Sequence, residues 1–312
     1  MKKIFFIFIT LAILFFSSSC SSDILKKNKV YILSVALNYQ NTNSSTGKLK
    51  GTINDVTELT TCLQQIYNSK GANVEVTYMI QEKTDSSFVG KCYPCKDNFI
   101  NELDNIKNNV SKDDTFLFIY SGHGQTEDNG VICLTAKDPK SGEDYHELEK
   151  IKMTEIFDII DSFPCNSIII ADCCYSGTLT EKYPEQTNTF SDAFSNMFKK
   201  TDFKHISVLA ASKNQEQSYE GPISTVSTDY SHGYFTYMLL KCLGWDHSKG
   251  QTLITINGEE RKLVGSLSEV PSRTSISEIY SQMLYLNKNE ARLFSIQNPT
   301  FTFDIQDSIL IP

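Results

Sequence analysis

Five short segments rich in apolar, β-branched and aromatic residues alternate along this chain with segments of helical periodicity. Continuous apolar runs of this length are typical of strands that are buried on both faces of a sheet. The predicted strands span residues 30–37, 73–80, 115–120, 167–172 and 206–211. Strands that alternate with helices predict an α/β fold, in which a mainly parallel sheet is flanked by helices on both faces.

The apolar residues between these strands recur at helical spacing. Helices are predicted over residues 52–67, 96–110, 154–163, 233–243 and 275–286. Short strands are expected at 130–134 and 301–305, and the polar stretch 178–202 is expected to be an irregular loop. The chain shows no internal repeat, so residues 30–312 are expected to form one domain.

The N-terminus has the pattern of an export signal. Two lysines precede the 13-residue run 4–16, which is too short to cross a bilayer, and three serines then lead to Cys20. A cysteine after small residues resembles a bacterial lipobox, so we expect a signal peptide over 1–19 and a lipidated Cys20. Residues 20–29 would then tether an exported domain to a membrane of the bacterial cell envelope.

Composition excludes some functions and leaves others open. The formal net charge is −8, so no basic surface favours nucleic-acid binding. The lone Cys92-x-x-Cys95 spacing is interpreted as a local disulfide or as two free thiols, because no further zinc ligands lie at suitable spacing. No metal or cofactor is therefore expected. Four histidines are interpreted as structural: His146, His205, His232 and His247.

Two motifs follow predicted strands: Ser-Gly-His-Gly at 121–124 and Asp-Cys-Cys-Tyr-Ser-Gly at 172–177. Ligands bind at the carboxyl ends of the strands in open α/β sheets, where both motifs fall. A cysteine nucleophile needs a histidine as its acid and base. His123 and Cys174 are 51 positions apart, the separation expected of caspase-type enzymes.

Strand alternation separates the two adjacent cysteines. Asp172 and Cys174 should share one side of their strand, while Cys173 packs on the other. We therefore predict that Cys174 attacks a carbonyl carbon, that His123 transfers the proton, and that the backbone N–H groups of Gly124 and Cys174 hold the oxyanion. The glycines that flank His123 are expected to permit a sharp turn and a close approach of substrate.

These motifs, with Leu49 to Val56, make the chain resemble the caspase-fold cysteine peptidases, and above all the metacaspases, from about residue 30 to 301. The resemblance implies a caspase-like fold and an endopeptidase with a His123–Cys174 dyad. It also implies protein or peptide substrates with arginine or lysine before the cleaved bond, bound by an acidic pocket of Asp55, Ser121 and Asp172.

The residues support a basic specificity independently, since two carboxylates suit a guanidinium. A competing interpretation of Asp55 is a capping box with Thr52 at the start of a helix. The three arginines lie near the C-terminus, which disfavours selection of aspartate.

Calcium activation, which the resemblance raises, has no dense acidic run to support it, since Glu127, Asp128 and Asp138 read as solvated loop charges. Two other functions remain open: a catalytically silent caspase-fold binding module on the cell envelope, and an acyl transferase or ligase.

Overall fold

The computed structural model describes residues 28–82, 92–125, 131–175, 205–211, 218–223, 230–291, 299–301 and 309–312. The predicted signal peptide, Cys20 and the 178–202 segment lie outside these residues. For Cys174 and Tyr175 the backbone is described but the side chains are not. Among the described residues, we find no helix that is long and apolar enough to cross a membrane.

The centre of the protein is an eight-stranded sheet with the path β13-β7-β6-β3-β1-β2. Its parallel strands are β1 (Lys29–Leu37), β2 (Asn73–Gln81), β3 (Thr115–Gln125), β6 (Asn166–Tyr175) and β7 (Ile206–Ala210). Its antiparallel strands are β4 (Val131–Thr135), β5 (Leu148–Lys152) and β13 (Thr300–Phe301). The predicted α/β fold is therefore confirmed.

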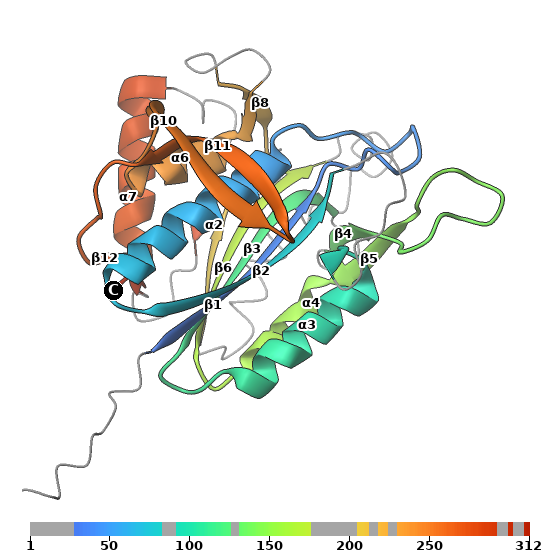
Figure 1. Cartoon of the computed structure of the whole chain (residues 1–312), viewed down its shortest axis with the longest axis horizontal. Coiled ribbons are helices and arrows are strands. Elements are labelled where there is room, and N and C mark those ends of the chain that lie inside the picture. Colours follow the sequence, from blue (N-terminus) through green and yellow to red (C-terminus); the bar gives the residue numbers. More distant parts are fainter. Residues whose placement is uncertain are drawn as a thin grey trace, which may run out of the picture.

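Helices cover both faces of the sheet (Figure 1). One face packs against α3 (Lys96–Asn109) and α4 (Met153–Asp161), and the other against α2 (Thr52–Ser69), α6 (Tyr234–Cys242) and α7 (Ile276–Leu286).

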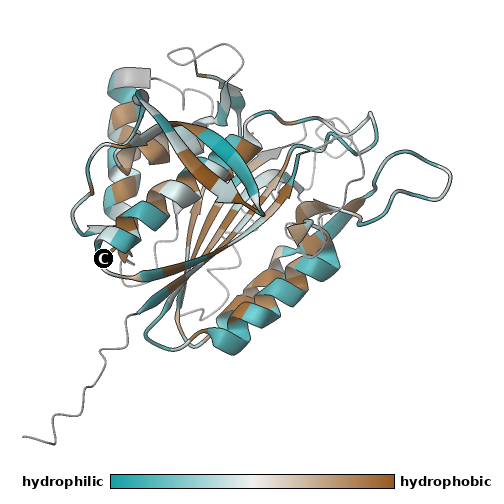
Figure 2. Ribbon diagram, in the orientation of Figure 1, coloured by the Kyte–Doolittle hydropathy of each residue, from teal (hydrophilic) through white to brown (hydrophobic). Residues whose placement is uncertain are grey.

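Side-chain alternation divides β1 between the two cores. Leu33 and Val35 enter the core under α3 and α4, while Ile32 and Ala36 enter the core under α2 and α6. The apolar residues gather between the layers, and the outer helix faces are hydrophilic (Figure 2).

A hairpin of β10 (Trp245–Ile256) and β11 (Glu259–Leu267) was not predicted from the sequence. It lies over α2 (Figure 1). Asn257 and Gly258 form its turn, with φ angles of 52° and 88°. Further short pairs join β8 (Glu220–Pro222) to β9 (Ser231–Gly233), and β12 (Thr274–Ser275) to β14 (Ile309–Ile311); a π-helical turn, η3 (Asn287–Ala291), follows α7.

Two local predictions need correction. Cys92 and Cys95 are free thiols, so the disulfide interpretation is wrong. The strands β3 and β6 continue to Gln125 and Tyr175, so residues 121–124 and 172–175 lie within the paired ends of these strands and not beyond them. Of the predicted last strand at 301–305, only Phe301 is described, as the end of β13.

Candidate active site

Two tyrosines fix the position of His123 at the end of β3. The hydroxyl of Tyr39 accepts a hydrogen bond from the His123 backbone N–H at 2.7 Å, and the hydroxyl of Tyr120 donates one to the His123 carbonyl at 2.6 Å. The Tyr39 ring also stacks on the imidazole, with ring centroids 4.4 Å apart. Both tyrosines are buried, so these contacts fix both the backbone and the ring of His123.

The hydrogen bonds of the imidazole determine its tautomer. Nε2 of His123 lies 2.7 Å from the carbonyl oxygen of Gly47, which accepts only, so Nε2 carries the proton. Nδ1 is buried and has no hydrogen-bond partner within the described part of the chain. Burial lowers the pKa of His123 below its ordinary value, and the positive charge of Lys48 acts in the same direction. The resting ring is therefore neutral, with an unshared electron pair on Nδ1.

The role of Gly122 differs from the prediction. A Cβ atom there would lie 2.7 Å from the hydroxyl oxygens of both Tyr39 and Tyr120. The missing side chain thus makes room for the two hydroxyls that hold His123. The predicted sharp turn is wrong, because β3 continues through Gly122 and Gly124 as a paired strand.

The parallel register brings the two motifs together. His123 is the Cα partner of Cys174, and Ser121 is the partner of Asp172. Adjacent parallel strands lie about 4.8 Å apart, so these backbone positions are direct neighbours. The Cys174 side chain is outside the described residues, and its role as nucleophile stays a prediction. The oxyanion role of the Gly124 and Cys174 N–H groups also stays a prediction.

Cys173 behaves as the alternation predicts. Its side chain is buried in the core under α3 and α4, away from Asp172, which faces α6. Burial raises the pKa of the Cys173 thiol well above its usual value, so this sulfur stays protonated near neutral pH.

The three predicted pocket residues lie together on the opposite side of the sheet from Cys173. Asp55 accepts hydrogen bonds from the Ser121 hydroxyl at 2.9 Å and from the Gly233 N–H at 2.9 Å. Asp172 accepts from the Ser218 hydroxyl at 2.7 Å and from the hydroxyl and N–H of Thr236, at 2.8 and 3.1 Å. Asp55 and Asp172 are buried, with 2% and 3% of their surfaces exposed.

The competing interpretation of Asp55 as a helix cap is wrong. The hydroxyl of Thr52 donates to the carbonyl of Leu37 and leaves the helix start uncapped by its own side chain. Just before α2, the carboxylate of Glu220 of β8 accepts hydrogen bonds from the N–H groups of Lys50 and Gly51, at 2.8 and 2.7 Å. The carboxylate of Asp55 therefore does not cap α2 and instead binds Ser121 and Gly233.

The two pocket carboxylates differ in their charge balance. Asp55 lies 2.8 Å from Nδ1 of His232, while Asp172 contacts no cationic side chain among the residues described. Burial, and after it the negative charge of Asp55, raises the pKa of Asp172 to about 7. Asp172 is therefore a buried carboxyl that lacks a positive partner and is balanced between its neutral and charged forms near pH 7.

A buried cluster beside the pocket was missed from the sequence. His232 of β9 contacts Asp55 through Nδ1 and Glu58 through Nε2, at 2.8 and 3.1 Å. His247 of β10 also contacts Glu58, at 2.8 Å. Burial lowers the pKa of His232, but its hydrogen bonds to Asp55 and Glu58 outweigh this effect and raise the pKa to about 9. The three segments are too far apart in sequence for any spacing motif to have indicated the cluster.

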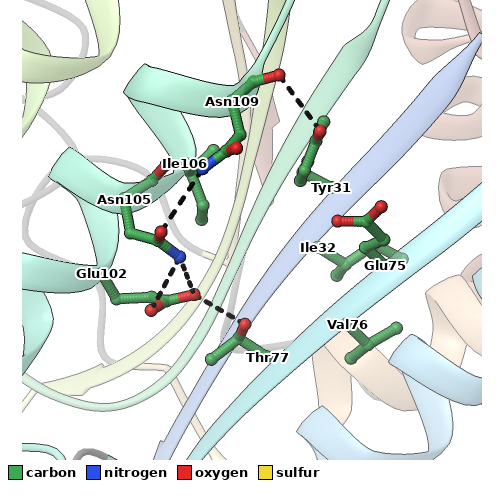
Figure 3. A pocket seen from close by; sticks show the side chains of 9 residues that line it. All are labelled: Tyr31, Ile32, Glu75, Val76, Thr77, Glu102, Asn105, Ile106 and Asn109. Carbon is green, nitrogen blue, oxygen red and sulfur yellow. Dashed lines mark hydrogen bonds between the residues drawn. The ribbon is translucent and has the colours of Figure 1, made fainter.

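A separate cavity of about 290 Å³ opens between α3 and the sheet edge at β1 and β2 (Figure 3). Its polar lining includes Glu75, Glu102 and Asn105, and Thr77 donates to Glu102 at 2.7 Å. None of the predicted site residues lines this cavity, so we do not assign the chemistry to it. Of the three acidic residues interpreted as solvated loop charges, Asp138 is exposed, whereas Glu127 and Asp128 lie outside the described residues.

The parallel sheet with His123 and Cys174 on adjacent strand ends defines a caspase-like α/β protein. Residues 32–183 match the family model described as metacaspase, peptidase C14 domain. Over residues 32–183 the chain is thus metacaspase-like, as its motifs had led us to expect.

Two plant proteins are similar to this chain. Metacaspase-8 of Arabidopsis thaliana is 30% identical over 159 residues, which cover 49% of this chain and 39% of that protein. Metacaspase-4 of the same plant is 26% identical over 158 residues, which cover 49% and 34%. The similarity thus spans less than half the length of these relatives. A crystal structure of a Geobacter sulfurreducens protein is also similar, with a TM-score of 0.49 and 15% identity over 88% of this chain and 92% of that one.

Proposed function

We propose that this protein is a cysteine endopeptidase that cleaves peptide bonds after arginine or lysine. One observation carries the catalytic part. The unshared electron pair on Nδ1 of His123 is buried without a partner among the described residues, on a strand whose register places Cys174 directly beside it. A buried imidazole nitrogen left unpaired costs free energy, and a thiol proton would satisfy it.

The proposed reaction uses His123 as base and then as acid. Nδ1 takes the proton from the Cys174 thiol, and the thiolate sulfur forms a bond to the carbonyl carbon of the substrate. The protonated Nδ1 then gives its proton to the leaving amine as the C–N bond breaks. Water hydrolyses the thioester and regenerates the thiol. Throughout, the Gly47 carbonyl accepts a hydrogen bond from Nε2–H and stabilises the imidazolium formed after the first transfer.

The proposed specificity rests on the charge of the pocket. A buried carboxylate without a cation is costly, so Asp172 favours a ligand that brings a positive charge. Asp55 and Asp172 each accept three hydrogen bonds from described donors, which leaves about one of four acceptor positions free on each. An arginine guanidinium or a lysine ammonium can donate to both.

Reporter peptides that end in arginine, lysine or aspartate test this function. We expect the purified protein, assayed both with and without calcium, to hydrolyse the arginine and lysine peptides and to leave the aspartate peptide intact. If it hydrolyses none of them under any condition, the binding-module hypothesis replaces the peptidase. If the aspartate peptide is preferred, the pocket assignment is wrong.

We also propose that Cys20 is lipidated and that the domain is held at a membrane of the cell envelope, on the support of the leader pattern at residues 1–20. Cells that express the protein should incorporate labelled palmitate into it, and Cys20→Ser should abolish the label and release the protein from the membrane fraction. Equal labelling of both forms would contradict the anchor.

A further inference from the structure

Three ligand-type side chains from distant segments meet beneath the β10–β11 hairpin. Glu58 comes from α2, His232 from β9 and His247 from β10, and their ligand atoms all lie within 4.8 Å of one another. Glu58 Oε2 is 3.1 Å from Nε2 of His232 and 2.8 Å from Nε2 of His247. The side chains of Glu58, His232 and His247 are 1%, 0% and 6% exposed.

We propose that Glu58, His232 and His247 form a binding site for a divalent transition-metal ion of the zinc class. Two imidazole nitrogens and one carboxylate oxygen are a ligand set that suits zinc, with water as the fourth ligand. Tetrahedral ligands with bonds of about 2.1 Å stand about 3.4 Å apart, so the distances from Glu58 Oε2 to the two histidine nitrogens, 3.1 and 2.8 Å, need to widen by about 0.3 and 0.6 Å. Binding displaces any proton from each Nε2.

The groups behind the ligands match those of a metal site. Metal-bound histidines usually donate their other ring N–H to a carboxylate, which orients the ring. Nδ1 of His232 makes this contact with Asp55 at 2.8 Å. The second oxygen of Glu58 accepts from the Val264 N–H at 3.2 Å and from the Tyr230 hydroxyl, so Oε2 remains directed at the two histidines.

The surroundings of the cluster favour zinc over calcium and indicate the side from which an ion could enter. The Tyr237 ring is near both imidazoles, with centroids 6.2 Å from His232 and 5.2 Å from His247. His247 is the most exposed of the three ligands and marks the entry side. Calcium prefers six or more oxygen ligands, so this nitrogen-rich site should discriminate against it.

The location connects the site with the acidic pocket. Asp55 accepts from His232 on one oxygen and from the Ser121 hydroxyl on the other, at 2.8 and 2.9 Å. An ion on His232 would therefore fix one wall of the pocket. This last link rests on the proposed function, whereas metal binding itself does not.

The test is a titration of the full chain with zinc, cobalt and calcium chlorides, followed by calorimetry. The Cys174→Ala form serves as the parent, because it removes the predicted thiol partner of His123. His247→Gln and Glu58→Gln remove one ligand each, and His205→Gln is the matched control at an exposed histidine outside the cluster. Thermal unfolding without metal shows which variants keep the fold.

We expect the parent and His205→Gln to bind one zinc ion per chain, and His247→Gln and Glu58→Gln to bind it at least tenfold more weakly. Cobalt should give tetrahedral bands without thiolate charge transfer, and calcium should not compete. The proposal is overturned if the parent binds no stoichiometric zinc, if thiolate bands appear, or if a folded ligand variant binds as tightly as the parent. If one ligand variant fails to fold, the other decides.

Discussion

Nε2 of His123 lies 2.7 Å from the carbonyl oxygen of Gly47, in the loop that follows β1. A carbonyl can only accept, so this contact assigns the proton to Nε2 and leaves Nδ1 as the basic nitrogen. The loop thereby does for His123 what a side-chain carboxylate does in many catalytic triads. Because the partner is a backbone atom, no residue type in the loop would have indicated it.

The Tyr39 hydroxyl should be needed for the position of His123. Tyr39→Phe removes the acceptor for the His123 N–H and a donor to the Cys133 carbonyl, at 2.7 Å each. Loss of a buried partner costs about 1–3 kcal/mol, which we expect in the free energy of unfolding. We also expect kcat to fall while KM changes little, measured by denaturant titration and peptide hydrolysis.

The matched control is Tyr31→Phe on β1. The Tyr31 hydroxyl donates to the Asn109 carbonyl at 3.2 Å, beside the cavity near α3 (Figure 3). This variant should lose stability but keep kcat. Equal effects of the two variants on kcat would contradict the positioning role of Tyr39.

The preference for basic peptides should depend on pH through Asp172. The pKa of this carboxyl is raised to about 7, so it is neutral at lower pH and charged at higher pH. A cation binds the charged form, so affinity should fall up to tenfold per pH unit below pH 7. The ratio of kcat/KM for an arginine peptide to that for a glutamine peptide isolates this ionisation from those of His123 and Cys174.

That ratio should rise from about pH 5 to about pH 8 and then level off. In Asp172→Asn the ratio should be low and independent of pH, while Glu75→Gln at the distant cavity should behave as wild type. A flat ratio in the wild-type protein would remove Asp172 from the pocket.

Gly233 should be required for the shape of the pocket. A Cβ atom at this position would lie 2.1 Å from Oδ2 of Asp172, so Gly233→Ala must displace the carboxylate. Overpacking of this kind costs about 1–3 kcal/mol of stability. Loss of one charge-assisted hydrogen bond should raise KM for arginine peptides about tenfold.

Gly258→Ala provides the control for this substitution. Gly258 has a φ of 88° in the β10–β11 turn, so alanine is strained at this position. The turn contains none of the pocket residues. Stability should fall without a change in KM. If Gly233→Ala leaves KM unchanged as well, Asp172 does not contact the substrate.

Much of the fold could be predicted because the central strands are buried on both faces. Segments such as 115–120 and 167–172 are therefore almost wholly apolar, which indicates a parallel sheet directly. The β10–β11 hairpin was missed, although Asn257-Gly258 between alternating residues is a strong hairpin signal. Its strands are half exposed, so their composition resembles that of a polar loop.

The site could be predicted only where it follows strand geometry. Alternation set Cys173 apart from Asp172, and the burial of Cys173 in the core under α3 and α4 confirms this separation. The Glu58–His232–His247 cluster depends on how α2, β9 and β10 pack, which local sequence does not encode. The role of Gly122 was misjudged because one of the two hydroxyls that fill its space belongs to Tyr39, which lies after the end of β1 and far from Gly122 in sequence.

The central claim is that Cys174, and not its neighbour Cys173, performs the chemistry with His123. The most direct measurement compares hydrolysis of an arginine reporter peptide by Cys174→Ala and Cys173→Ala, each checked for folding by thermal unfolding. Cys174→Ala should lose at least a thousandfold in kcat/KM, an order typical of a lost nucleophile, while Cys173→Ala should keep most of its activity. Activity that survives in Cys174→Ala, or that disappears only in a folded Cys173→Ala, would contradict the account.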